Sequence, residues 1–123
     1  MESQTYDRWR ARQEQDWNDE YQSGRREFYI RLIKYLDSMY YETSILNEEY
    51  TELKNNLTKE LYNQKGLWYE TLDAFKSGFK SFSKECTVVV NEAIQKPLIS
   101  KLTGLSILKK IDEIEDQVET IKQ

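Results

Sequence analysis

Few side chains in this chain could carry out chemistry, and their spacing does not assemble a catalytic site. The 123 residues contain no histidine, which removes the commonest general base and the commonest zinc ligand. Cys86 therefore has no histidine to activate it as a nucleophile. The acidic pairs Glu48-Glu49 and Asp112-Glu113 lie beside apolar stripes, where solvated carboxylates are the default, and no glycine-rich phosphate loop is present. The sequence predicts a protein that is not an enzyme and that holds no metal or cofactor.

The elements that would position any site are marked by stripes of mainly apolar residues. Stripe positions recur three and four residues apart, a spacing that places them on one side of an α-helix. They form three sets: Leu36, Met39, Thr43, Leu46, Tyr50, Leu53 and Leu57; Trp68, Leu72, Phe75, Phe79, Phe82, Cys86, Val89 and Ala93; Ile107, Ile111, Ile114, Val118 and Ile121. Such a stripe must be covered by another helix of the chain or by a partner. The function of this chain must therefore be argued from packing.

Composition points to one all-α domain over residues 1–123. One proline, four glycines and 33% charged residues suit helices, and the hydrophobic share of 38% with a mean hydropathy of −0.85 suits helices with one buried face. We expect an elongated, antiparallel, coiled-coil-like helical hairpin with an aromatic N-terminal helix and a short C-terminal helix. The net charge of −4 argues against a nucleic-acid partner. The basic clusters, Arg8, Arg10 and Arg12, then Arg25 and Arg26, are interpreted as solvated helix faces.

The N-terminal segment, about residues 5–24, is predicted to be an amphipathic helix with an aromatic face. Tyr6, Trp9, Trp17 and Tyr21 fall within roughly a 120° arc at 100° per residue. Two interpretations remain open: the aromatic face packs on the rest of the chain, or it anchors a partner. Ser23-Gly24 is either a weak point in this helix or the start of the next one.

Three further helices are predicted, over about residues 25–62, 67–95 and 105–122. The pattern from Tyr40 to Ser44 tolerates a strand locally, but the surrounding periodicity favours helix. Gly66 follows a polar stretch and is expected to end the first long helix, so that the next one folds back antiparallel. Gly78 either lets a neighbouring backbone come close or weakens its helix.

The sequence also gives expectations about membrane insertion and cellular location. No run of about 18 apolar residues is present, which predicts no membrane span, and the polar N-terminus predicts a cytoplasmic chain without a secretory leader. Cys86 falls on the second stripe between Phe82 and Val89, so we interpret it as a small buried side chain.

The segment around Gly66-Leu67-Trp68, a turn with Gly and Trp between two helices, resembles the helical hairpins of type VII (ESX-type) secretion. Over about residues 25–122 the layout is most similar to the accessory proteins encoded beside LXG-domain toxins. Tyr69 and Asp73 match the Y-x-x-x-D form of the secretion signal of those proteins. The resemblance implies that Tyr69 and Asp73 belong to an export signal, and that the chain leaves the cytoplasm with its partner by a type VII route.

The resemblance further implies a non-catalytic targeting factor or chaperone that binds the helical N-terminal region of a secreted toxin. Tyr6, Trp9, Trp17, Tyr21 and Trp68 are then the expected partner-binding residues. Two alternatives stay open at this point: a self-associating coiled-coil structural protein, which would form a homo-oligomer, and an immunity-type or phage-type inhibitor. Binding of the N-terminal helix to a membrane surface is a remote third alternative, against which its mixed charge argues.

Overall fold

The computed structural model describes residues 2–63 and 73–121, and the chain is all-helical over these residues. Its elements are α1 (Glu2–Tyr41), α2 (Asn47–Tyr62), α3 (Ala74–Gln95), α4 (Lys101–Asp116) and a short 3₁₀ turn, η1 (Gln117–Thr120). The predicted all-α class is confirmed. None of the described helices combines the length and the apolar composition needed to cross a bilayer.

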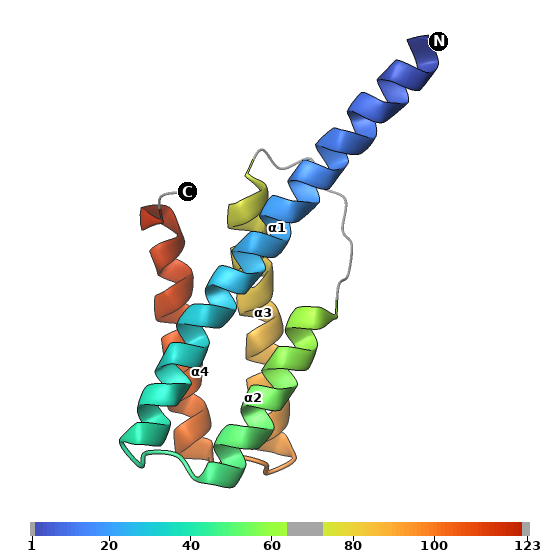
Figure 1. Ribbon diagram of the computed structural model, residues 1–123. Helices are drawn as coiled ribbons and strands as arrows, with labels where there is room; N and C mark the ends of the chain where they lie inside the picture. The colour runs from blue at the N-terminus through green and yellow to red at the C-terminus, as the bar shows by residue number, and fades with distance from the viewer. Residues whose placement is uncertain (1, 64–72, 122–123) are drawn as a thin grey trace.

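Helices α1 and α3 form the central pair of the bundle, and α2 and α4 lie on opposite sides of this pair (Figure 1). Consecutive helices run in alternating directions, so α1 and α3 point the same way. Polar contacts agree with this arrangement. Tyr29 and Asp37 of α1 meet Thr58 and Tyr50 of α2 in reverse order along the chain, as expected for antiparallel neighbours.

Most stripe positions that lie in described helices are buried in the core, while Tyr50, Phe75 and Val89 are only partly buried. Phe28 of α1 makes edge-to-face contacts with Phe79 and Phe82 of α3, with ring centroids 5.1 and 6.1 Å apart. Leucines of α2 and isoleucines of α4 belong to the same core cluster as these phenylalanines. The fully buried stripe members are Leu36, Leu53, Leu57, Phe79, Phe82, Cys86, Ile107, Ile111 and Ile114. Leu32 and Val90 are equally buried although neither lies on a predicted stripe.

Two glycines allow α1 and α3 to approach each other closely. A Cβ added to Gly24 would collide with the carbonyl oxygen of Phe75 and would lie 2.9 Å from the backbone nitrogen of Phe79. A Cβ added to Gly78 would collide with the carbonyl oxygen of Tyr21 and would lie 2.8 Å from its carbonyl carbon. Of the two interpretations of Gly78, the structure supports close backbone approach. Helix α1 also continues without interruption through Ser23-Gly24, so the expected boundary between residues 24 and 25 is wrong.

The single helix expected over residues 25–62 is also wrong, because the chain reverses between Tyr41 and Asn47. The amide of Ser44 donates to the carbonyl of Met39 and that of Thr43 donates to Tyr40, the two bonds of a Schellman ending. Thr43 takes the left-handed conformation with φ of 56°. The periodic pattern continues across this turn, but Thr43 and Leu46 are exposed rather than buried.

The other two predicted helices have shifted ends. Helix α3 begins only at Ala74, because Asp73 caps it by accepting the amide of Lys76 at 3.0 Å, so an unbroken helix over residues 67–95 is wrong. Helix α4 begins at Lys101 rather than near residue 105, because Ser100 caps it by accepting the amide of Thr103. Gly66 lies outside the described residues.

Candidate docking surface

The N-terminal part of α1 extends beyond the ends of the other described helices (Figure 1). Where the structure describes side chains along α1, burial begins at Tyr21, whereas Arg8 is exposed and Trp17 is half-buried. We call residues 2–20 the N-terminal extension. The side chains described within this segment are exposed or half-buried: Arg8, Trp17, Asn18, Asp19 and Glu20.

The predicted partner-binding residues differ in burial and in whether the structure describes their side chains. Tyr21 is only 4% exposed and its ring stacks on Trp17, with centroids 5.1 Å apart, so its ring is covered by the chain itself. Trp17 lies where the extension leaves the bundle. The side chains of Tyr6 and Trp9 lie outside the description, although both residues belong to the helical part of α1. Trp68 and Tyr69 lie outside the described residues.

A groove of about 610 Å³ lies beside α1 from Glu20 to Arg31, where the extension joins the bundle. Its walls come from α1, from the first turn of α3 and from the C-terminal end of the chain: Glu20, Ser23, Glu27, Arg31, Phe75, Thr120 and Ile121. Arg31 is held in place by Glu27 at 2.9 Å and by Gln117 at 2.6 Å. The groove is open and mixes charged, polar and apolar atoms, so it suits side chains of a macromolecular partner better than a small ligand.

A salt bridge fixes the first turn of α3 to the C-terminal end beside this groove. Lys76 approaches the two carboxylate oxygens of Glu119 at 2.6 and 2.8 Å. The hydrogen bond from Lys76 lowers the pKa of the Glu119 carboxyl. The carboxylate is therefore ionised at neutral pH, and the ion pair connects Lys76 and Glu119, the sequence neighbours of the lining residues Phe75 and Thr120.

Arg25, predicted to lie on a solvated helix face, is instead buried and only 1% exposed. Its guanidinium donates to the carbonyl oxygens of Glu60 and Leu61 at 3.0 and 3.3 Å, where α2 ends. It also pairs with Glu85 of α3 at 2.8 Å and lies over the Phe82 ring. A cation suits the carbonyl end of a helix, so Arg25 joins three helices below the extension.

Glu49 is the second charged residue that sequence reasoning placed in solvent and that the structure buries. One of its carboxylate oxygens accepts the amide of Leu46 at 3.2 Å, and the other accepts the amide of Ser100 at 2.7 Å. The first bond is half of a capping box at the start of α2. The second bond holds the turn between α3 and α4 against the turn between α1 and α2.

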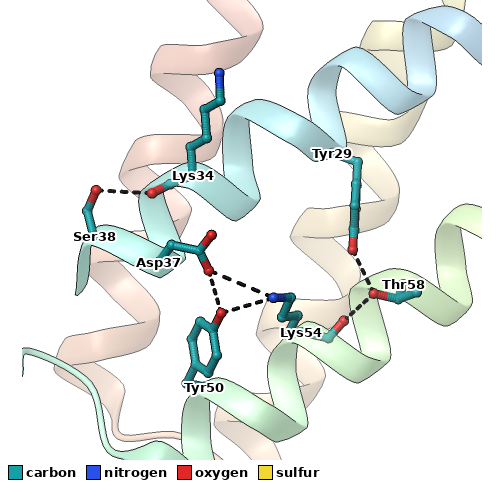
Figure 2. A network of polar contacts seen from close by, with 7 residues as sticks. All are labelled: Tyr29, Lys34, Asp37, Ser38, Tyr50, Lys54 and Thr58. Atoms are coloured by element: carbon teal, nitrogen blue, oxygen red, sulfur yellow. Dashed lines mark hydrogen bonds and ion pairs between the residues drawn. The ribbon is translucent and has the colours of Figure 1, made fainter. Parts of the chain in front are cut away.

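Figure 2 shows a polar network between α1 and α2 on the outside of the bundle. Tyr50 donates to the carboxylate of Asp37 and accepts from the Lys54 ammonium at 3.0 Å, while Tyr29 meets Thr58 at 2.8 Å. The hydrogen bond to Asp37 raises the pKa of Tyr50, because it favours the protonated phenol. The hydrogen bond to Tyr50 raises the pKa of Lys54. The charges of Asp37 and Lys54 are paired with each other and with the Tyr50 hydroxyl. The network therefore acts as a clamp that holds α1 and α2 together rather than as a reactive site.

The remaining candidates for chemistry do not gather into a site in the part of the chain that the structure describes. Cys86 is fully buried among core side chains, and burial raises the pKa of its thiol well above the ordinary value. Within residues 2–63 and 73–121, no group of three or more cysteine or acidic side chains is placed to hold a metal ion. Comparison of the chain with protein-family models, with curated proteins and with solved structures finds no match.

Proposed function

We propose that this chain is a non-catalytic helical adaptor whose N-terminal extension binds helices of a protein partner. The proposal rests chiefly on one observation, that α1 extends beyond the ends of the other described helices. The sequence of this extending segment places aromatic residues on one helix face. An isolated helix of about 12–15 residues is only marginally stable in water. Helices of a partner laid beside the extension would cover the aromatic face and continue the bundle.

The geometry at the base of the extension supports this mode of binding. The half-buried Trp17 ring rests on Tyr21, which is fixed at the close crossing of α1 and α3. The groove between Glu20 and Ile121 begins at the same level of the bundle. A partner helix that runs along the extension would therefore meet a rigid surface where it reaches the bundle.

The proposed partner is the helical N-terminal region of a secreted toxin of the LXG type, and the proposed role is targeting it to type VII secretion. This choice of partner follows from the resemblance of the turn and layout to the accessory proteins of such toxins. Tyr69 and Asp73 are the proposed export signal. Asp73 already caps α3, so in this proposal the signal lies directly before a helix start.

Co-expression tests the proposal. The full chain would be produced with the N-terminal helical region of an LXG-domain toxin encoded by the adjacent gene, with an affinity tag on the toxin. We expect the chain to co-purify with the tagged toxin in a fixed ratio. The double variant Trp9→Ala/Trp17→Ala should lose co-purification while its thermal unfolding stays close to that of the parent.

Tyr62→Ala supplies the matched control, because Tyr62 is an exposed aromatic residue at the end of α2 rather than in the extension. This variant should co-purify like the parent. Absence of co-purification by the parent chain would reject the toxin as the partner. Co-purification that survives both tryptophan substitutions would reject the extension as the binding surface.

A further inference from the structure

Two turns of the chain lie at the end of the bundle opposite the extension (Figure 1). Exposed apolar side chains lie on or beside both turns. The turn over 42–46 and the turn over 96–100 are held together by Glu49, which accepts the amides of Leu46 and Ser100. Tyr41 is 85% exposed, Leu46 69% and Leu102 81%. Leu98 and Leu105 are also exposed on the side of the second turn. We call these five residues the loop-end patch.

Five large apolar residues are exposed at this one end of the bundle. Single exposed leucines are common on protein surfaces, whereas several large apolar side chains gathered at one end of a molecule are a feature of interaction surfaces. Leu46 and Ser100 each bind one oxygen of the same carboxylate, so the two turns are neighbours in space despite their separation in sequence. Leu102 and Leu105 are three residues apart on α4 and share one helix face.

The charges beside the loop-end patch are divided between the two turns. Glu42 and Glu48 are exposed beside the turn between α1 and α2. Lys96 and Lys101 are exposed beside the turn between α3 and α4. In a two-fold symmetric dimer whose axis runs between the two turns, each turn of one copy faces the other turn of the second copy. A second copy of this chain would therefore place the basic side of one patch against the acidic side of the other.

We propose that the loop-end patch is the contact surface of a symmetric dimer of this chain. The apolar side chains form the centre of the interface, and the acidic and basic residues pair at its rim. The two N-terminal extensions then point away from each other and stay open to partners, so the dimer is independent of the proposed adaptor function. A bilayer fits this surface less well, because Glu42 and Glu48 would face anionic lipid headgroups.

Sedimentation equilibrium of the full chain at neutral pH and physiological salt tests the dimer. We expect the average mass to rise from one chain toward two as the concentration increases. Leu46→Ser/Leu102→Ser should weaken the association at least tenfold without changing the circular dichroism spectrum. Ile30→Ser/Val88→Ser replaces two exposed apolar residues elsewhere on the bundle and should leave the association unchanged.

The charge pairing has its own test that does not depend on the apolar side chains. Lys101→Glu should weaken the dimer, and Glu48→Lys in the same chain should restore it. A chain that stays monomeric up to millimolar concentration would overturn the proposal, as would a dimer that survives the loop-end substitutions. Binding of the monomer to vesicles of phosphatidylcholine and phosphatidylserine, lost on Leu46→Ser/Leu102→Ser, would assign the patch to a lipid surface instead and would also overturn it.

Discussion

The two parts of α1 share one continuous helix but differ in what covers them. From Tyr21 to Tyr41 the helix is pressed against α3 and flanked by α2 and α4, and its inward residues are buried. The N-terminal extension continues the same helix beyond the ends of those partners (Figure 1). Most helical stability in proteins comes from packing of an apolar face. The part of α1 from Tyr21 to Tyr41 therefore belongs to the packed bundle, and the extension is the surface that we propose for a partner.

The largest effect that would sharpen this contrast is expected at the crossing of α1 and α3. Gly78→Ala brings a Cβ onto the carbonyl of Tyr21, and backbone atoms there cannot move aside without separating the helices. We expect a loss of about 3 kcal/mol in the free energy of unfolding, the upper range for overpacking. Urea denaturation followed by circular dichroism measures this loss.

Gly104→Ala is the control for that variant, because the added Cβ would meet the end of the flexible Ile94 side chain instead of a backbone. It should cost clearly less than Gly78→Ala. Alanine is intrinsically about 1 kcal/mol better than glycine within a helix. A Gly78→Ala variant that gains stability would show that the two helices are not in close contact.

Arg25→Met is expected to have the next largest effect, roughly 2 kcal/mol of destabilisation. The substitution leaves the last carbonyls of α2 without their cation and removes the ion pair between Arg25 and Glu85. Arg26→Met changes the neighbouring exposed arginine and should stay within about 0.5 kcal/mol of the parent. Equal losses for the two variants in chemical denaturation would contradict the burial of Arg25.

Tyr50→Phe tests the clamp between α1 and α2 and should cost about 1 kcal/mol, the typical net value of a hydrogen bond. The pKa of Tyr50 is raised in the folded chain above its ordinary value of 10.0, because the phenol donates to Asp37. The contribution of this bond is therefore fully present below pH 10 and is lost as the pH rises through the raised pKa. Parent and variant should converge in stability over that alkaline range, which thermal melts at stepped pH would reveal.

The smallest effect is expected in the extension itself. Removal of residues 1–16 should leave the melting temperature of the bundle nearly unchanged, because the buried part of α1 begins at Tyr21. Differential scanning calorimetry compares the two chains. A drop of many degrees would mean that the extension packs on the bundle, and the contrast between the two parts of α1 would fail.

Much of the fold could be predicted from the sequence, because apolar periodicity survives in every helix. Leu53, Phe79 and Ile111 lie on predicted stripes and are fully buried. The end of α1 could not be found in this way. Its left-handed position is occupied by Thr43 instead of glycine, so the usual stop residue is missing, and the stripe continues in phase across the turn.

The site could be predicted less well, since it depends on which residues tertiary contacts cover. Tyr21 belongs to the predicted aromatic face, but the close approach of Gly78 places it in the interior. Arg25 and Glu49 look like surface charges in any local window, and only their distant partners, the end of α2 and the amide of Ser100, explain their burial. The burial of a charged side chain that pairs with a residue distant in sequence cannot be recognised from the spacing of its sequence neighbours.

Amide hydrogen exchange along α1 of the full-length monomer tests the central claim most directly. We expect a step in protection: residues 25–40 exchange only through global unfolding, whereas amides of the extension show the low protection of a helix that no neighbour covers. Uniformly high protection from residue 2 to residue 40 would contradict it.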